Sequence, residues 1–295
     1  RDATTHNLHH LNADIPLGVL TCITGVAGAG KTSLLTNLPR CADIQVIDQH
    51  PIRGSRRSTP ATYTGVMDWL RDAFAKAGST PGHKLKPAMF SANSAGACPD
   101  CTGLGVTYLD APGSSPVPVT CTTCNGARYT ADVLTHTLDG LTIADVLGLP
   151  VADAAPRYTN PPAGPPLASL VDVGLGYLTL GQPLSTLSGG ERQRLRLATR
   201  IAHSATVYAL DEPTTGLHMS DVDPLTRLLH RLVDGGATVV VADHHLNLVA
   251  TADHIIDLGP DAGPDGGRIT YQGPAADLPT TDTHTGRALA ARLAL

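Results

Sequence analysis

The amino-acid sequence predicts an α/β fold in which both ends of the chain build one core and an inserted region interrupts it. The first fifty residues alternate short apolar runs with a helix-like stretch, as βαβ units do. The same alternation returns from Leu187 to Leu258, after an interruption of roughly 130 residues that contains two Cys-x-x-Cys pairs. A chain of 295 residues can hold such a core with a small insertion, but not two full domains of ordinary size.

The elements can be placed in chain order from periodicity and turn residues. Apolar runs and amphipathic stretches predict strands at 17–24, 44–48, 206–210 and 237–242, and helices at 31–38, 66–76, after Ser188, at 224–233 and in the C-terminal tail. Changes of periodicity and composition divide the chain into five segments, 1–50, 51–97, 98–129, 130–186 and 187–295. The first and last form the core, the second is a connection and the third holds the cysteine pairs. The fourth contains a proline-rich stretch, 156–166, where we expect no regular structure.

The composition excludes two classes of nucleic-acid binder. Aromatic residues are only 3% of the chain, which disfavours a protein that stacks bases on a row of aromatic rings. The formal net charge of −5 excludes a protein that coats DNA by its overall charge. Any phosphate binding must therefore come from a local patch or loop.

We expect neither a membrane span nor an export signal in this sequence. The strongest apolar run, Ala237 to Ala242, has the length of a strand and not of a membrane span. The chain begins Arg1-Asp2-Ala3, without an initiator Met, which suggests a processed chain or a piece of a longer one. We expect a cytoplasmic protein without a membrane partner, in which paired cysteines bind metal more readily than they form disulfides.

A phosphate-binding loop lies between the first predicted strand and the first predicted helix. Residues Gly25 to Thr32 fit the pattern G-x-x-x-x-G-K-[ST]. Such glycines, here Gly25, Gly28 and Gly30, let backbone N–H groups close around phosphates at a helix N-terminus. Lys31 would then reach the β- and γ-phosphates of ATP and Thr32 would bind Mg²⁺, with Ser33 beside them. A chance glycine turn would not have these flanking elements.

A second element of the same site follows the insertion. Val207 to Leu210 is an apolar strand that ends in Asp211 and Glu212. Asp211 is placed to hold the Mg²⁺ shell, and Glu212 to take the proton of an attacking water. A strand ending in Asp-Glu is weak evidence alone, but it becomes strong beside a phosphate loop.

The run Leu187-Ser188-Gly189-Gly190-Glu191 resembles the signature motif of the ATP-binding cassette (ABC) superfamily. The resemblance implies that Ser188, Gly189 and Gly190 bind the γ-phosphate of ATP held by an opposing cassette. It also implies catalytic roles for Gln49, as the Q-loop glutamine, and for His244, as the switch histidine. The arginines that follow the signature are expected on a solvated helix face.

Two ABC cassettes must close head to tail over two ATP molecules, and the run 214–218 stands at the D-loop position. The resemblance therefore implies a second cassette, which is either another copy of this chain or an N-terminal half. The resulting fold is an ABC-type ATPase core split by a four-cysteine zinc module, 98–129, and a helical signature subdomain, 130–186.

The four paired cysteines have the spacing of a structural zinc site. Cys98-x-x-Cys101 and Cys121-x-x-Cys124 are separated by nineteen residues. Four thiolates close a tetrahedron around Zn²⁺ and leave no open position for a substrate. J-domain co-chaperones have a similar module, but they carry four such pairs and no phosphate loop. Cys22 and Cys41 are expected to be packed thiols.

A cassette with this insertion between the Q-loop and the signature resembles the C-terminal half of the UvrA family. The stretches that carry the resemblance are 6–8, 15–18, 49–52, 60–65, 90–91, 172–177, 180–182, 187–191, 210–218 and 256–260. They cover nearly the whole chain in the family's order. The family implies an ATP-modulated dimer that binds double-stranded DNA, senses bulky damage in bacterial nucleotide excision repair and loads a helicase-like subunit.

The sequence departs from the family where basic residues serve DNA. Ser94 and Ala97 stand at basic positions before the first cysteine pair, and Ala127 replaces a usual Lys after the second. The remaining basic clusters are Arg53, Arg56 and Arg57, and Lys84 with Lys86. The segment between Thr32 and Gln49 is also much shorter than in the repair protein.

These departures leave two alternatives open. The chain could be a divergent UvrA-like paralogue that gives resistance to a DNA-binding drug, as the lost basic residues suggest. It could also be a clamp that binds ATP only to set its conformation and does not hydrolyse it. Transporter and translation-factor cassettes fit less well, because they lack the zinc insertion.

Overall fold

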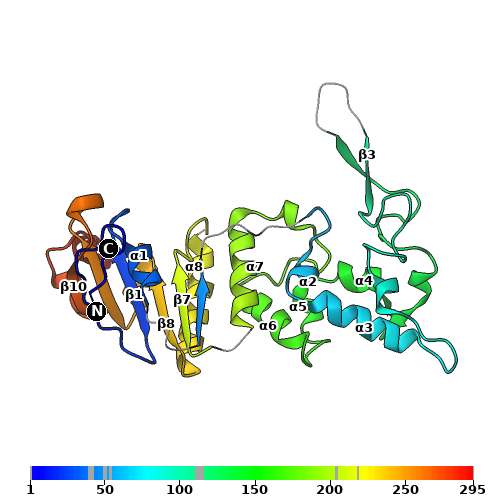
Figure 1. Cartoon of the computed structure of the whole chain (residues 1–295), viewed down its shortest axis with the longest axis horizontal. Coiled ribbons are helices and arrows are strands. Elements are labelled where there is room, and N and C mark those ends of the chain that lie inside the picture. Colours follow the sequence, from blue (N-terminus) through cyan, green and yellow to red (C-terminus); the bar gives the residue numbers. More distant parts are fainter. Residues whose placement is uncertain are drawn as a thin grey trace. The chain divides into compact units, whose positions relative to one another are not determined.

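The computed structural model describes residues 2–38, 43–48, 52, 55–109, 116–202, 205–217 and 219–294. The chain forms two compact units (Figure 1). One, here called the core unit, consists of Arg1–Pro51, Asp172–Gly174 and His203–Leu295. The other, the insert unit, consists of Ile52–Val171 and Leu175–Ala202.

The core unit is built on a six-stranded sheet in the order β10-β9-β1-β8-β7-β2. Its strands are β1 Leu20–Gly25, β2 Ile44–Ile47, β7 Val207–Asp211, β8 Thr238–Ala242, β9 His254–Gly259 and β10 Arg268–Pro274. Every neighbouring pair is parallel except β9 and β10. Residues of β1 and β8 are buried throughout, which explains why neither strand carries a charged residue. The carboxyl ends of β1, β7 and β8 meet at one edge, where the site residues lie.

Helices of the core unit confirm the predicted alternation, with different ends. They are α1 Lys31–Thr36, α8 Met219–Asp234, α9 Leu246–Thr251 and α10 His284–Leu293. Leu34 and Leu35 of α1 pack with Ile23, Val240 and Ile256 in the buried cluster of this unit. The α/β class is therefore confirmed, and β9 and β10 are the strands of this sheet that the sequence analysis did not predict.

The insert unit contains short helices and two hairpins. The helices are α2 Pro60–Tyr63, α3 Val66–Gly78, α4 Ile143–Gly148, α5 Val151–Ala154, α6 Gly164–Asp172 and α7 Gly189–Ile201, with 3-10 turns at Pro87–Phe90, Val133–Thr135 and Leu184–Thr186. The hairpins are β3 Val106–Leu109 with β4 Val117–Thr120, and β5 Thr137–Leu138 with β6 Leu141–Thr142. On α3, Leu70 and Phe74 are fully buried, and the ring of Phe74 lies 5.4 Å from that of Phe90.

One expectation about this unit was wrong. The proline-rich stretch 156–166 was expected to contain no regular structure, but α6 begins inside it, at Gly164. Pro165 and Pro166 occupy the first turn of the helix, where a backbone N–H has no intrahelical partner to lose. Within the described part of the chain, no helix is both long and apolar enough to cross a membrane.

Candidate functional site

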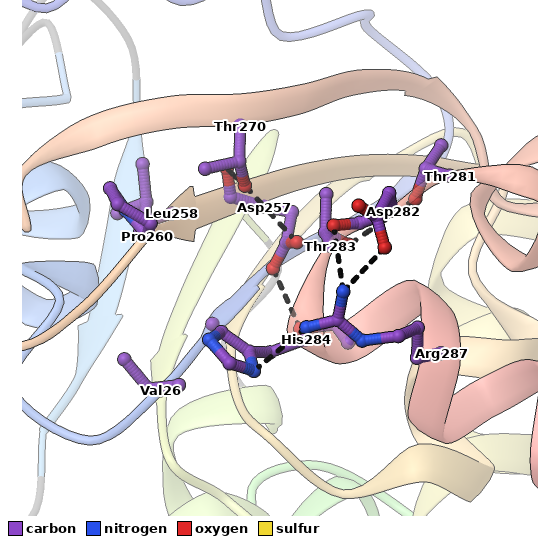
Figure 2. Close-up of a pocket in the computed structure, with 13 residues that line it drawn as sticks. Val26, Asp257, Leu258, Pro260, Thr270, Thr281, Asp282, Thr283, His284 and Arg287 are labelled. Atoms are coloured by element: carbon purple, nitrogen blue, oxygen red, sulfur yellow. Dashed lines mark hydrogen bonds and ion pairs between the residues drawn. The ribbon is translucent and has the colours of Figure 1, made fainter.

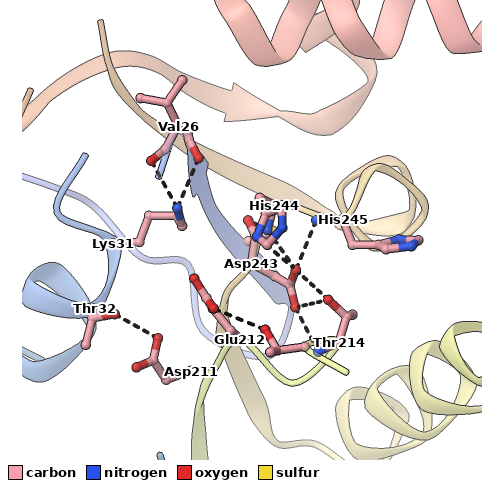
Figure 3. Close-up of polar contacts among 12 residues, drawn as sticks. Val26, Lys31, Thr32, Asp211, Glu212, Thr214, Asp243, His244 and His245 are labelled. Carbon is pink, nitrogen blue, oxygen red and sulfur yellow. Dashed lines mark hydrogen bonds and ion pairs between the residues drawn. The ribbon is translucent and has the colours of Figure 1, made fainter. Parts of the chain in front are cut away.

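The phosphate loop joins the end of β1 to the start of α1. Gly25 has a φ of 131°. A Cβ atom at this position would lie 2.1 Å from the carbonyl oxygen of Leu258, which is too close for any side chain. Gly30 precedes the helix with a φ of 102°. The buried Lys31 ammonium donates to the carbonyl oxygens of Gly25, at 3.0 Å, and of Val26, at 3.1 Å (Figure 3). The lysine is therefore held inside the loop that would surround a phosphate.

Thr32 and Asp211 meet beside the loop, as the sequence predicts for a magnesium site. The Thr32 hydroxyl donates to Asp211 Oδ1 at 3.0 Å (Figure 3). Burial raises the pKa of Asp211, while the hydrogen bond from Thr32 opposes the rise and the charge of Glu212 adds to it. A hydroxyl and a carboxylate that prefers a positive neighbour fit the oxygen ligands that Mg²⁺ takes in phosphate loops.

Glu212 is held at the same edge by contacts to two neighbouring segments. Its backbone N–H donates to the carbonyl of Ala242 at 2.7 Å, and the Thr215 hydroxyl donates to Glu212 Oε2 at 3.1 Å. Its φ of 44° is uncommon for a residue with a side chain. A conformation of this kind persists only where the surroundings fix it, and it is frequent at functional sites.

A buried carboxylate that the sequence analysis missed connects the loop after β7 with the loop after β8. Asp243 follows β8 and is 0% exposed. It accepts hydrogen bonds from the Thr214 hydroxyl at 2.8 Å and from the backbone N–H groups of Thr214, His244 and His245 (Figure 3). The signal was present in the sequence, since a charged residue directly follows the buried apolar run 239–242.

The predicted switch histidine lies at the surface of this edge. The side chain of His244 is 63% exposed, and its Nδ1 is 4.0 Å from Asp243 Oδ1. Ser33, on α1, lies within hydrogen-bond distance of the His6 ring, at 3.2 Å from Nδ1. Gln49, His218 and Cys41 lie outside the described residues. Cys22 is buried, as expected of a packed thiol, and burial raises the pKa of that thiol.

The signature segment starts α7 in the insert unit. Ser188 caps the helix: its hydroxyl accepts the Glu191 N–H at 3.2 Å, and Glu191 Oε2 accepts the Ser188 N–H at 2.6 Å. Gly189 is exposed and Gly190 is buried. Tyr177, 14 residues earlier in the sequence, donates its hydroxyl proton to Glu191 Oε1 at 2.6 Å. The serine and glycines of the signature thus have a fixed conformation within this unit.

The hydrogen bonds around Glu191 affect its titration. Burial disfavours the ionised carboxylate, but the hydrogen bonds from Tyr177 and Ser188 outweigh it and lower the pKa of Glu191.

The arginines after the signature are less exposed than expected. Arg194 is 8% exposed, and Arg192 and Arg196 are half-buried, so only Arg200 lies on the solvated face. The expectation of a solvated arginine face was therefore wrong for most of this set. The long aliphatic stem of arginine can cover apolar surface, which explains how such a helix packs.

The four paired cysteines converge in the insert unit. Their sulfur atoms lie within 4.8 Å of one another, with 4.0 Å between Cys98 and Cys121 and 3.7 Å between Cys101 and Cys124. A tetrahedral zinc ion with Zn–S bonds of about 2.3 Å would hold sulfurs about 3.8 Å apart. Burial and the neighbouring thiols raise the pKa of Cys124, whereas backbone hydrogen bonds lower the pKa of Cys121. Four thiolates at these distances repel one another, so a bound cation is needed to hold them together. The predicted four-cysteine zinc-binding site is confirmed.

Three glycines and two arginines shape the zinc module around this site. Gly103, Gly105 and Gly126 have φ values of 78°, 77° and 84°, a backbone conformation that glycine adopts in tight turns. Arg57 donates to the carbonyl of Thr102 at 2.9 Å and to its hydroxyl at 2.8 Å. Arg56 lies over the ring of Tyr108, 4.8 Å from its centroid. Both arginines therefore contact the zinc module itself, although the sequence analysis placed them in one of the remaining basic clusters.

A separate cavity of about 480 Å³ lies beside the phosphate loop (Figure 2). The buried Asp257, on β9, accepts hydrogen bonds there from Thr285, on α10, at 2.8 Å and from Thr270, on β10, at 3.2 Å. Arg287 pairs with Asp282 at the same opening. Asp257 thus ties the last strand and the last helix to β9.

The chain is similar to known proteins over nearly its whole length. A family model described as "ABC transporter" matches residues 168–215. UvrABC system protein A of Halalkalibacterium halodurans is 41% identical over 98% of this chain and 33% of its own length. The Aquifex aeolicus protein of the same name is 42% identical over 97% of this chain and 34% of its own. This chain therefore spans about a third of the length of these curated relatives.

A solved structure is similar over the same extent of this chain. The crystal structure of UvrA2 from Deinococcus radiodurans superposes with a TM-score of 0.84 at 38% identity, over 98% of this chain and 39% of that one. The similarity includes the cysteine module and the signature, so it extends beyond a general ATPase fold.

Proposed function

Because this chain is an ATP-binding cassette of the UvrA family, we propose that it hydrolyses ATP and couples this reaction to double-stranded DNA in bacterial nucleotide excision repair. One observation carries the proposal. Lys31, Thr32, Asp211 and Glu212 meet at the carboxyl edge of β1 and β7, and His244 follows β8 at that edge. Those are the groups that phosphate binding and water attack require.

Each residue has a role that its contacts support. Lys31 leaves the two loop carbonyls to bind the β- and γ-phosphates, and Gly25, Gly28, Gly30 and Ser33 surround them. Thr32 and Asp211 would hold Mg²⁺, which neutralises phosphate charge when it is bound.

Water attack would be handled at the same edge. Glu212, oriented by Thr215, accepts the proton of the attacking water. His244, whose ring is exposed at this edge, would contact the γ-phosphate, and Gln49 would complete the set.

The signature of this chain serves a second cassette. Ser188, Gly189 and Gly190 offer a capped helix N-terminus to the γ-phosphate of ATP on an opposing cassette. The second cassette is another copy of this chain or a further part of a longer protein. Double-stranded DNA and a helicase-like repair subunit are the other partners that the family suggests, and such partners are consistent with the expected cytoplasmic location.

A second function is favoured by one set of observations. Ser94, Ala97 and Ala127 replace basic residues, and Arg56 and Arg57 contact the zinc module. A module with fewer free cations would contact phosphates weakly, which suits a UvrA-like paralogue that recognises a drug bound to DNA.

The test is equilibrium binding to fluorescent duplexes, with zinc-loaded protein, its second cassette and Mg-ATP. Glu212→Gln protein is used to hold ATP, and Asp234→Asn, at an exposed acid, is the matched control. Undamaged, bulky-adduct and drug-adduct duplexes are compared at several salt concentrations. Tighter binding to every bulky adduct supports excision repair, and preference for the drug adduct alone supports resistance. Equal binding to all three, or binding to none, contradicts both.

ATP turnover separates the enzyme from a passive clamp. We expect Glu212→Gln to lower kcat by about 10²-fold or more, because the general base is lost. Wild-type protein that binds ATP but shows no turnover with its second cassette would establish the clamp.

A further inference from the structure

We infer that Asp243 is a positioning residue of the ATPase site, which fixes the loop that carries Glu212 against the loop that carries His244. The inference rests on the proposed ATP hydrolysis. Asp243 does not belong to the phosphate loop, to the strand-end carboxylates or to the signature, so none of these motifs gives it a role.

The contacts of Asp243 join two segments that are far apart in sequence. From the loop after β7, Thr214 donates its backbone N–H to Oδ2 at 3.1 Å and its hydroxyl to the same carboxylate at 2.8 Å. From its own loop, the N–H groups of His244 and His245 donate to Oδ1 at 2.7 and 3.0 Å. One side chain thereby determines the separation of the two loops (Figure 3).

The burial of this carboxylate indicates that its geometry is specific. Asp243 is 0% exposed and Thr214 is 7% exposed. Burying a carboxylate is unfavourable unless hydrogen bonds replace the lost water, and here amides and a hydroxyl do so. An apolar residue could fill the same space, but it could not accept bonds from both loops. An asparagine would place an amide NH₂ group against one of the N–H donors.

The hydrogen bonds of Asp243 affect both groups that would surround the attacking water, Glu212 and His244. Glu212 is two residues before Thr214, and its N–H donates to Ala242, the residue before Asp243, at 2.7 Å. Thr215, the next residue after Thr214, donates to the Glu212 carboxylate. His244 directly follows Asp243, and its ring lies at the surface. The backbone of the histidine is thus fixed while its ring stays available to a ligand.

The test removes one hydroxyl group from the hydrogen bonds of Asp243. Thr214→Val keeps the size and the backbone N–H but removes the hydroxyl donor to Asp243, and Thr214→Ser restores it. Thr226→Val is the matched control, because Thr226 is 8% exposed and its hydroxyl donates at 2.9 Å to Val222 within α8. Asp243→Asn is the second probe. All variants are assayed with the second cassette present, for kcat, KM for ATP and thermal midpoint.

We expect Thr214→Val and Asp243→Asn to lower kcat by about 10- to 100-fold with KM for ATP changed less than about 3-fold, since misplacement affects the reacting geometry more than binding. Thr214→Ser should recover kcat to within about 3-fold of wild type, and Thr226→Val should match wild type. A positioning role predicts this split and this rescue, whereas a purely structural role predicts that kcat follows the thermal midpoint.

Two results would overturn the inference. One is that Thr214→Val and Asp243→Asn both have the same kcat as Thr226→Val. The other is a loss of kcat that the thermal midpoint alone accounts for, without recovery in Thr214→Ser. If wild-type protein itself shows no turnover, the proposed ATPase fails instead, so the two failures are distinguishable.

Discussion

The core unit and the zinc module hold their chemical groups in different ways. In the core unit, the phosphate loop and the carboxylates lie at the end of a sheet whose strands bury Leu20, Cys22, Val239 and Val241 completely. In the zinc module, the buried cluster is the four cysteines themselves, with only Ala127 packed against them among the described residues. Strands β3 and β4 expose apolar side chains, including Leu109 and Val117.

The difference teaches which part of the molecule can fold by itself. A sheet that buries many apolar residues can position Lys31 and Asp211 without a cofactor. A small module with almost no apolar core depends on metal binding for its stability. The predictions below test this contrast, from the largest expected effect to the smallest.

Zinc removal should unfold the module and leave the core unit intact. Structural zinc contributes on the order of 10 kcal/mol to small domains of this kind. We expect chelation, or Cys121→Ser, to remove the hydrogen-exchange protection of the Cys98 and Cys121 amides, which donate to Arg128 and Gly105. The amides of β1 and β8 should stay protected. Cys22→Ala is the control that should retain zinc, and equal loss in both units would contradict the contrast.

Lys31→Ala should remove ATP binding without disturbing the zinc module. The ammonium is the cation at the proposed phosphate site, so we expect affinity for ATP to fall by about 10²-fold. Zinc content should not change. Titration with a fluorescent ATP analogue measures the loss, and Lys76→Ala, an exposed lysine on α3, should behave as wild type. Unchanged affinity would remove the phosphate loop from the proposal.

Thr285→Val should weaken the core unit alone. The substitution removes a hydroxyl that donates to the buried Asp257. We expect the free energy of unfolding of the core unit to fall by about 1 kcal/mol, with Thr285→Ser close to wild type. Urea unfolding measures this change. If zinc release showed that Thr285→Val destabilises the zinc module by the same amount, the two units would not unfold separately.

Tyr177→Phe should have the smallest effect, and it should depend on pH. The hydroxyl lowers the pKa of Glu191, so the ionised carboxylate stabilises the fold above the pKa that Glu191 has in the unfolded chain. This stability is lost as the pH falls through the lower, folded-state value. Because the pair is partly solvated, we expect the variant to lose about 1 kcal/mol or less at pH 7.

The titration itself can be observed directly. The sequence contains only two glutamates, Glu191 and Glu212, so ¹³C-carboxyl NMR can follow each of them. The pKa of Glu191 should rise in Tyr177→Phe, and the loss in stability should vanish once the pH lies below the folded-state pKa of Glu191. An unchanged Glu191 titration would show that the hydrogen bond contributes nothing in solution.

Local spacing explains what the sequence could predict. The phosphate loop, the strand-end pair Asp211-Glu212 and the paired cysteines are each encoded within a few residues, and the structure brings each set together. Asp243 and Asp257 were missed because their meaning depends on partners in other segments. Strand β10 was missed because it pairs antiparallel at an edge, where its burial is only partial. Strand β9 was missed although it is buried, because Asp257 interrupts its apolar run. Pro165 and Pro166 misled the analysis because proline disrupts a helix interior but not its first turn.

The two carbonyl contacts of Lys31 have a consequence for how ATP binding is measured. A phosphate entering the loop must displace Gly25 and Val26 as partners of the ammonium. Binding is therefore an exchange of hydrogen bonds and not a simple gain, so its enthalpy should be smaller than the number of new contacts suggests. Calorimetry on this protein would report the difference between two well-bonded states of one lysine.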